Sequence, residues 1–231
     1  KYLNNHDDLN QKQHYILCQK ILESYLEKNF VKLEFLEYKK YLIEIVNYSK
    51  AGIGFLLNLK TIDPGAKLSF EVPIDFNAAD VEYEFIGSVD CIATTKFGMM
   101  IFDFKRSAAG IPSFSAWKEF SKIQLWFYAN YSNIELSKIA CLGYLNLSDI
   151  ENSLIMPTSK DIYQEIVDKI GVKVNKKEYS FIDLSKDFQE LCHNTIYEIK
   201  NEKEFLANPK NSSVCKYCTV VNICDRGGKN E

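Results

Sequence analysis

Two aspartates and a lysine, Asp90, Asp103 and Lys105, lie close together within apolar stretches of the chain. Asp103 and Lys105 end the apolar run 99–102 and are two residues apart, so in a strand they project from the same face. Asp90 lies in the preceding β-rich run, in a position to face Asp103 across a strand pair. Two facing carboxylates repel each other unless a proton or a cation intervenes.

A divalent cation such as Mg²⁺ or Mn²⁺ would relieve this repulsion. Such ions prefer hard oxygen ligands, and the backbone carbonyl of Phe104 could be a further one. Lys105 would point into the same space, where it could hold a phosphate or orient an attacking water. The alternative interpretation is a hairpin with three solvated charges, because Asp-x-Lys alone is a common triplet.

A β-hairpin is expected to position these groups. Residues 81–95 predict the strand that contains Asp90, residues 96–98 a turn, and residues 99–105 the strand that ends at Lys105. An earlier strand over 67–76 alternates apolar and polar residues, so that Glu71 faces away from its apolar neighbours. Residues 138–147 predict a buried strand that pairs inside the same sheet.

A helix is predicted over 113–131. Its apolar residues recur at spacings of three and four: Trp117, Phe120, Ile123, Phe127, Tyr128 and Tyr131. Gln124 shares this face, and a buried glutamine needs hydrogen-bond partners, which a metal site or a substrate would supply. Gln124 and Tyr128 are one turn apart and point together. Periodicity alone fits a core aromatic helix with one tolerated glutamine equally well.

These motifs, taken in order, resemble the PD-(D/E)XK nuclease superfamily, and within it the RecB/AddB-type branch. The matching residues are Gly87-x-x-Asp90, Asp103-x-Lys105 and Gln124-x-x-x-Tyr128, and the resemblance spans roughly residues 67–224. It implies an α/β fold with a restriction-endonuclease-like core, in which helices flank a central mixed β-sheet.

The resemblance also implies roles. The catalytic residues would be Asp90, Asp103, Lys105, Glu71, Gln124 and Tyr128. The ligands of Mg²⁺ or Mn²⁺ would be Asp90, Asp103, the carbonyl of Phe104 and His14. The substrate would be DNA, cut exonucleolytically on ends that a helicase domain or subunit supplies. Arg106, beside the site, could contact a substrate phosphate, although a surface arginine is an equal alternative.

His14 heads the apolar face of a helical pattern that continues to Leu26. The resemblance implies that a helix before the hairpin supplies a metal-binding histidine, and His14 is the best match, although the glycine that usually precedes it is absent. A hydrogen-bonded core histidine is an equal alternative. His6 is a weaker candidate because it precedes the periodic run.

Three cysteines cluster near the end of the chain as Cys215-x₂-Cys218-x₅-Cys224, a spacing that suits metal binding. The resemblance implies a 4Fe–4S cluster with an early cysteine as fourth ligand. No cysteine precedes His14, so the fourth ligand would lie upstream of the sequence or be missing. Cys18 is the only early alternative for the fourth ligand, but it lies on the same apolar helical face as His14, which suits a role in packing better than metal binding. Zinc held with His193 and the absence of any metal are further options.

The bulk properties suit a single domain of 231 residues, divided into N-terminal helices (1–62), a catalytic sheet core (63–147), C-terminal strands and helices (148–208) and a cysteine-rich tail (209–231). The sequence begins without a methionine, which suggests a fragment of a longer protein. The sequence contains no run of 18 apolar residues, so no membrane span is predicted. The scattered cysteines favour a reducing, cytoplasmic setting.

The net charge of −3 counts against tight autonomous DNA binding but not against a nuclease whose DNA a partner delivers. The main alternative function is a catalytically degenerate module that binds DNA ends or acts as a scaffold in a helicase–nuclease complex. A zinc-dependent binding module is a third class, and it would leave the Asp-x-Lys motif unexplained.

Overall fold

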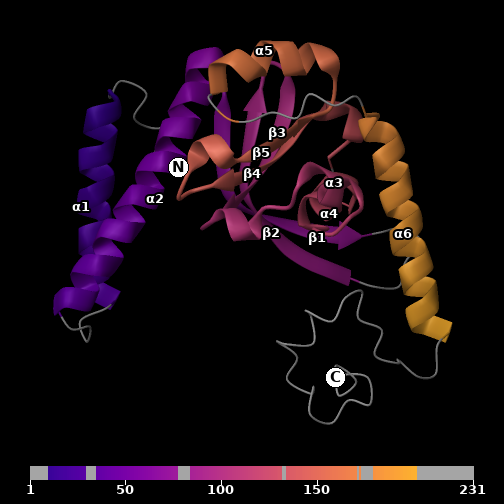
Figure 1. Ribbon diagram of the computed structural model, residues 1–231, viewed down its shortest axis with the longest axis horizontal. Helices are drawn as coiled ribbons and strands as arrows, with labels where there is room; N and C mark the ends of the chain where they lie inside the picture. The colour runs from indigo at the N-terminus through magenta and orange to yellow at the C-terminus, as the bar shows by residue number, and fades with distance from the viewer. Residues whose placement is uncertain are drawn as a thin grey trace, which may run out of the picture. The chain divides into compact units, whose positions relative to one another are not determined.

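The computed structural model describes residues 10–29, 35–77, 84–131, 134–170, 172 and 179–201. The chain divides into two compact units, residues 1–189 and 190–231. The first unit holds the sheet and the helices around it (Figure 1). In the second unit the described residues, 190–201, are the C-terminal part of helix α6 (Phe181–Asn201). The predicted cysteine-rich tail lies outside the described residues.

The core of the first unit is a five-stranded mixed sheet with the order β1-β2-β3-β4-β5. Its strands are β1 (Lys67–Asn77), β2 (Glu84–Thr95), β3 (Gly98–Lys105), β4 (Ile139–Asn146) and β5 (Leu154–Pro157). Only β3 and β4 pair in parallel; the other three pairs are antiparallel. The predicted mixed sheet flanked by helices is therefore confirmed. The short edge strand β5 was not predicted, because four residues carry too little alternation to indicate a strand.

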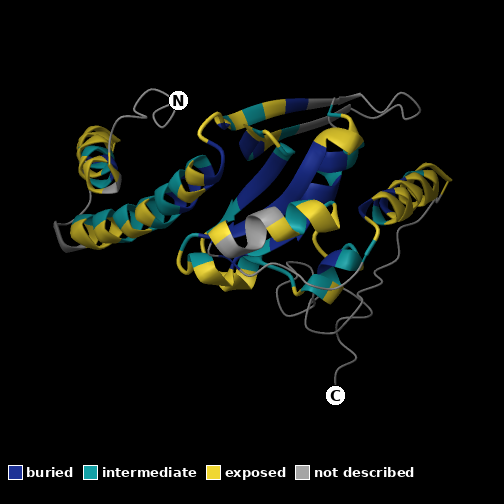
Figure 2. Cartoon of the chain, turned by 90° about the horizontal axis from the view of Figure 1, so that it is seen from above, coloured by how far each residue is buried: buried dark blue, intermediate teal, exposed yellow. Residues whose placement is uncertain are grey.

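Two layers of helices cover the sheet, and the alternation of side chains along β3 decides which residue faces which layer. Phe102 faces helix α2 (Phe35–Ile62), where its ring meets that of Phe55 edge-on at 5.2 Å. Asp103, the next residue, therefore points to the opposite face, which α3 (Phe114–Lys118) and α4 (Gln124–Tyr131) cover. Figure 2 shows the strands as the buried centre between partly exposed helices.

The remaining helices include the one that the apolar pattern from His14 to Leu26 predicts. Helix α1 (Gln11–Asn29) packs on α2, and α5 (Lys160–Ile170) lies near α2 on the same face of the sheet. Three short 3₁₀ turns, at 108–110, 136–138 and 150–152, occur in the connections around β4. Within the described ranges, no helix combines the length and apolarity needed to cross a membrane.

The prediction of one continuous helix over 113–131 is wrong. The chain leaves the helix after Lys118 and re-enters it at Gln124, and Phe120 between them has a left-handed φ of 55°. The indole N–H of Trp126 donates to the Trp117 carbonyl at 3.1 Å, which holds the two short helices together. Tertiary packing of these buried aromatics overrides the helical periodicity, and Gln124 becomes the first residue of its own helix.

Gly98, the first residue of β3 after the β2–β3 turn, gives a first testable prediction. Its φ is +120°, and a Cβ added there would lie 2.6 Å from the Lys138 carbonyl oxygen. Gly98→Ala is therefore expected to lower the free energy of unfolding by at least about 2 kcal/mol, measured by urea denaturation. Gly52→Ala, inside α2 with its nearest contact at 3.4 Å, is the matched control and should be neutral or stabilising. Equal losses in both variants would contradict the prediction.

Candidate active site

The β2–β3 pairing ends where the two predicted carboxylates stand. The last paired residues of these antiparallel strands are Cys91 and Phe102, so Asp90 and Asp103 occupy the next, facing positions. Asp90 Oδ2 accepts a hydrogen bond from the backbone N–H of Phe104 at 2.7 Å. The carboxylate thus satisfies a backbone donor that the neighbouring strand leaves open. The structure brings the two aspartates together at one end of the sheet.

Asp103 is buried, with 1% of its side chain exposed, and Lys105 Nζ lies 2.5 Å from its Oδ2. No other hydrogen-bond donor in the described part of the chain reaches this oxygen. Burial raises the pKa of Asp103 above its ordinary value; the hydrogen bond and charge of Lys105 oppose this rise, and the charge of Asp90 adds to it. Burial therefore disfavours the ionised carboxylate even beside the ammonium.

Gln124 and Tyr128 connect the lysine to the neighbouring strand. Lys105 Nζ donates to Gln124 Oε1 at 3.0 Å, and Gln124 Nε2 donates to the Tyr128 hydroxyl at 2.9 Å. The Tyr128 hydroxyl in turn donates to the backbone carbonyl of Ser88 in β2 at 2.8 Å. The glutamine predicted to need buried partners therefore has one on each side, and its amide can face only one way without losing both bonds.

Glu71 lies beside these groups in an irregular part of β1. The β1–β2 ladder keeps the same register before and after Glu71 but omits the pair that it would form with Asp90. Glu71 has a φ of 48°, which side-chain-bearing residues rarely adopt. The Ser88 hydroxyl donates to Glu71 Oε2 at 3.4 Å. The exposed glutamate is thus near Asp90, and its backbone has a strained conformation of a type that is common at functional sites.

Arg106 is directed elsewhere. Its guanidinium forms an ion pair with Glu44 of α2, and its Nε donates to the Tyr48 hydroxyl at 3.2 Å. The arginine side chain is 71% exposed. In this arrangement Arg106 ties the end of β3 to α2, and a substrate phosphate would have to compete with Glu44 for it.

His14 lies in α1 and is buried, with 1% of its surface exposed. The described residues hold no cluster of three or more histidine, cysteine, aspartate or glutamate side chains arranged to bind a metal. The structure therefore does not gather His14 with Asp90 and Asp103, and its role as a ligand stays a prediction. Cys215, Cys218 and Cys224 lie outside the described residues, as does their predicted cluster.

The donor set at the end of β3 nevertheless suits a divalent cation. Asp90, Asp103 and the Phe104 carbonyl offer the hard oxygens that Mg²⁺ and Mn²⁺ prefer, with Glu71 nearby. Asp103 Oδ2 is buried, and burial raises the pKa of this carboxyl, so a bound cation would favour its ionised form. These residues therefore fit such an ion.

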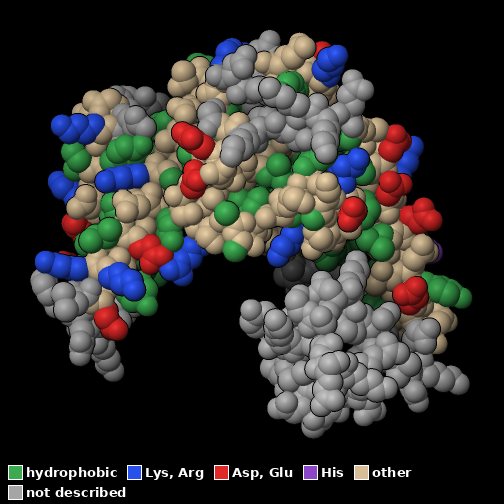
Figure 3. Space-filling view, viewed as in Figure 1, with side chains coloured by type: hydrophobic (Ala, Val, Ile, Leu, Met, Phe, Trp, Pro, Cys, Tyr) green, Lys and Arg blue, Asp and Glu red, His purple; other side chains and the backbone are tan. Residues whose placement is uncertain are grey.

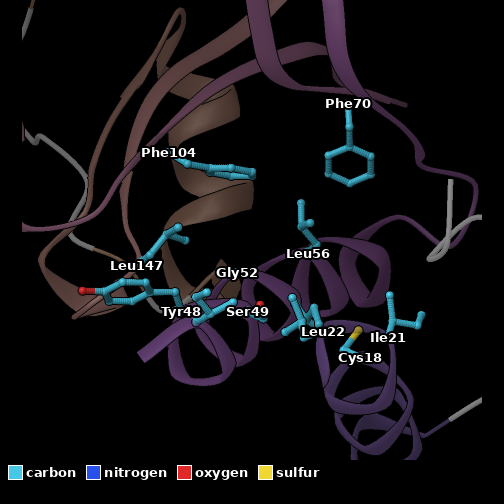
Figure 4. Close-up of a pocket in the computed structure, with 12 residues that line it drawn as sticks. Cys18, Ile21, Leu22, Tyr48, Ser49, Gly52, Leu56, Phe70, Phe104 and Leu147 are labelled. Atoms are coloured by element: carbon cyan, nitrogen blue, oxygen red, sulfur yellow. The ribbon is translucent and has the colours of Figure 1, made fainter. Parts of the chain in front are cut away.

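An apolar cavity of about 540 Å³ lies on the other side of the sheet, between α1, α2 and the strands (Figure 4). Cys18, Leu22, Leu56, Phe70 and Phe104 are among the residues that line it. Burial raises the pKa of the Cys18 thiol, which disfavours the thiolate that a metal needs. This supports the packing interpretation of Cys18, and the cavity offers no carboxylates for hydrolytic chemistry.

Two residues at the site were missed by sequence reasoning. Ser88 supplies both a carbonyl to Tyr128 and a hydroxyl to Glu71. Tyr144 in β4 is fully buried, and its ring centroid lies 5.6 Å from Lys105 Nζ. For Ser88, the one available signal in the sequence was its position inside the Gly87-x-x-Asp90 motif. Tyr144 carried no such signal, because its sequence context is that of any aromatic residue in a buried strand.

Lysine and arginine side chains mix with acidic ones over the described surface in Figure 3. This mixture accords with the net charge of −3. Among the described residues on the face seen there, no extended basic stripe of the kind that marks tight autonomous nucleic-acid binding is visible.

The match to a protein-family model agrees with this geometry. The family described as the PD-(D/E)XK nuclease superfamily matches residues 6–225. No curated protein matches the chain. A solved structure titled "Crystal structure of SSO0001" shares 18% sequence identity, with a TM-score of 0.31 over 92% of this chain and 97% of that chain. With the family covering nearly the whole sequence and the Asp103-x-Lys105 pair beside Asp90, the chain belongs to the PD-(D/E)XK nuclease superfamily.

Proposed function

We propose that this protein is a divalent-metal-dependent deoxyribonuclease of the RecB/AddB type, which hydrolyses phosphodiester bonds. The observation that carries the proposal is the pairing of two facing aspartates with an ammonium 2.5 Å from the buried one. The Gln124–Tyr128 pair, which holds that ammonium from the other side, supports the same proposal.

Asp90, Asp103 and the Phe104 carbonyl would hold Mg²⁺ or Mn²⁺, with Glu71 and His14 as further candidate ligands. When bound, such an ion supplies an activated water and neutralises charge on the phosphate. Because Lys105 contacts both Asp103 and Gln124, its ammonium is directed to a place beside the carboxylates. A fixed positive charge at that place stabilises the negative charge that develops on the phosphate during the reaction.

Tyr128 contributes by orienting the amide of Gln124. Tyr128→Phe removes the hydroxyl that accepts from Gln124 Nε2 and donates to the Ser88 carbonyl. We expect kcat for DNA cleavage to fall about tenfold, the equivalent of one hydrogen bond of about 1.4 kcal/mol. Tyr197→Phe, at a 64% exposed position, should leave kcat unchanged. A Tyr128→Phe enzyme with the parent's kcat would show that the hydroxyl does not orient Gln124 for catalysis.

Cleavage of end-labelled linear single- and double-stranded DNA, with Mg²⁺, Mn²⁺ or EDTA, tests the proposal. Metal-dependent shortening from one labelled end supports an exonuclease, and the products give the polarity. RNA of the same sequence tests the preference for DNA. A folded parent that leaves both nucleic acids intact with either metal would contradict the enzyme and favour the degenerate, end-binding module.

We further propose that a helicase domain or subunit delivers the DNA. The mildly acidic net charge supports this, because a chain with little electrostatic attraction for DNA gains most from a partner that feeds it. A cytoplasmic location belongs to the same proposal, because the scattered cysteines of the sequence favour a reducing compartment. The 4Fe–4S cluster at the late cysteines stays a prediction from the family resemblance, and visible absorption with iron analysis tests it against zinc.

A further inference from the structure

Three groups surround the ammonium of Lys105, and one of them comes from a strand outside the motifs. Asp103 Oδ2 lies 2.5 Å from Nζ and Gln124 Oε1 lies 3.0 Å from it. The third is the ring of Tyr144, whose centroid lies 5.6 Å from Nζ. Tyr144 pairs with Asp103 in the parallel β3–β4 ladder, so the two side chains leave the sheet on the same face.

The Tyr144 ring is itself held firmly in place. Tyr144 is 0% exposed, and its ring packs against the ring of the equally buried Trp117, with the two centroids 5.0 Å apart. Trp117 in turn belongs to α3, which the Trp126 hydrogen bond fastens to α4, the helix that begins with Gln124. The ring is therefore a fixed surface rather than a mobile side chain.

Tyr144 does not suit proton transfer. Burial, followed by the charge of Asp103, raises the pKa of its phenol above the ordinary value, so the hydroxyl stays protonated at neutral pH. What remains for Tyr144 to offer the ammonium is the negatively polarised face of its ring, which attracts cations more strongly where water is excluded.

We propose that Tyr144 is a positioning residue for Lys105: the fixed ring of β4 supports the ammonium between the Asp103 carboxylate and the Gln124 amide. This inference rests on the proposed nuclease function. It adds strand β4 as a third element of the site, beside the strand with the Asp-x-Lys motif and the helix with the Gln-x-x-x-Tyr motif. Without the ring, the lysine side chain keeps two hydrogen-bond partners but gains rotameric freedom.

The test compares two substitutions at one position with a matched substitution elsewhere. Tyr144→Phe keeps the ring and removes the hydroxyl, whereas Tyr144→Leu removes the ring. Phe55→Leu makes the same aromatic-to-leucine change in the buried core on the opposite face of the sheet. If Tyr144→Leu does not fold, Tyr144→Met serves instead, because its flexible side chain fills the same space without a ring.

The first measurement is independent of activity. In protein labelled with ¹³C at lysine Cε, an aromatic ring close to Lys105 shifts the resonance of its ε-methylene group, which Lys105→Arg identifies by deletion. We expect this shift to persist in Tyr144→Phe and Phe55→Leu and to move toward that of a free lysine in Tyr144→Leu. An unchanged Lys105 resonance in a folded Tyr144→Leu protein would overturn the inference.

The second measurement is steady-state DNA cleavage. We expect Tyr144→Leu to lower kcat about tenfold with little change in KM, Tyr144→Phe to stay near the parent, and Phe55→Leu to lower Tm without lowering the kcat of the folded protein. Equal kcat losses in Tyr144→Leu and Phe55→Leu would show that Tyr144 contributes only to core packing and does not position Lys105. A parent without nuclease activity would instead contradict the proposed function, and the resonance of Lys105 would still decide the positioning role.

Discussion

Replacing Lys105 with alanine is expected to lower kcat for DNA cleavage by about 10²–10³-fold, the cost of losing a fixed group that stabilises transition-state charge. The ammonium has no substitute within the described residues, because the nearby Arg106 is paired with Glu44 on α2. Lys105→Ala also removes the cation that lies 2.5 Å from Asp103 Oδ2. The pKa of Asp103, already raised by burial, should rise further.

The control for this prediction is Lys138→Ala. Lys138 is 59% exposed and pairs with Glu135 on the surface, so its loss should change neither kcat nor stability measurably. Single-turnover cleavage at saturating enzyme separates chemistry from binding. A Lys105→Ala enzyme that cleaves within tenfold of the parent would show that the lysine is a structural partner of Asp103 rather than part of the catalytic machinery.

Replacing Asp103 with asparagine is expected to abolish cleavage and, at the same time, to stabilise the fold. The amide keeps the shape of the carboxyl group but removes the charge whose burial raises the pKa of Asp103. We expect a gain in the free energy of unfolding on the order of 1 kcal/mol at pH 7, which corresponds to a rise in Tm of about 2–4 °C. Asp187→Asn, at an exposed position, should change neither quantity.

The pH dependence of this gain has a definite sign. Because the pKa of Asp103 is raised in the folded protein, the parent binds this proton more tightly when folded and loses stability as pH rises through the folded pKa. The advantage of Asp103→Asn should therefore be complete above that pKa and disappear below about pH 4, the ordinary range of an unfolded aspartate. Urea denaturation across this range measures it, and an asparagine variant less stable than the parent at pH 7 would refute the argument.

Together these two variants distinguish catalytic from structural roles. If both residues served only the fold, removing the buried charge would be harmless to activity. A stabilised but inactive Asp103→Asn protein would instead show that the parent tolerates an unfavourable buried charge because the reaction needs it, the usual trade between stability and function.

The amino-acid sequence by itself determined the elements that carry the site. The period-2 pattern of an apolar strand places Asp103 and Lys105 on one face wherever that strand lies, and the turn residues before Met99 bring the preceding strand and Asp90 alongside. The four longer strands were predicted from these local patterns, whereas the mixed sheet was an implication of the family resemblance. Gln124 and Tyr128 were recognised as a pair because they are one helical turn apart.

Tertiary structure alone decided which partners these residues have. The break at Phe120, which makes Gln124 the start of a helix, follows from the packing of Trp117 and Trp126 and not from any helix-breaking residue. The pairing of Arg106 with Glu44 joins residues 62 positions apart. The Tyr144 ring meets Lys105 because β3 and β4 run in parallel and keep one register from Met100 to Lys105. Local periodicity predicts the face of a strand or helix on which a side chain lies. Contacts between distant segments cannot be predicted in this way, because they depend on how the whole chain packs.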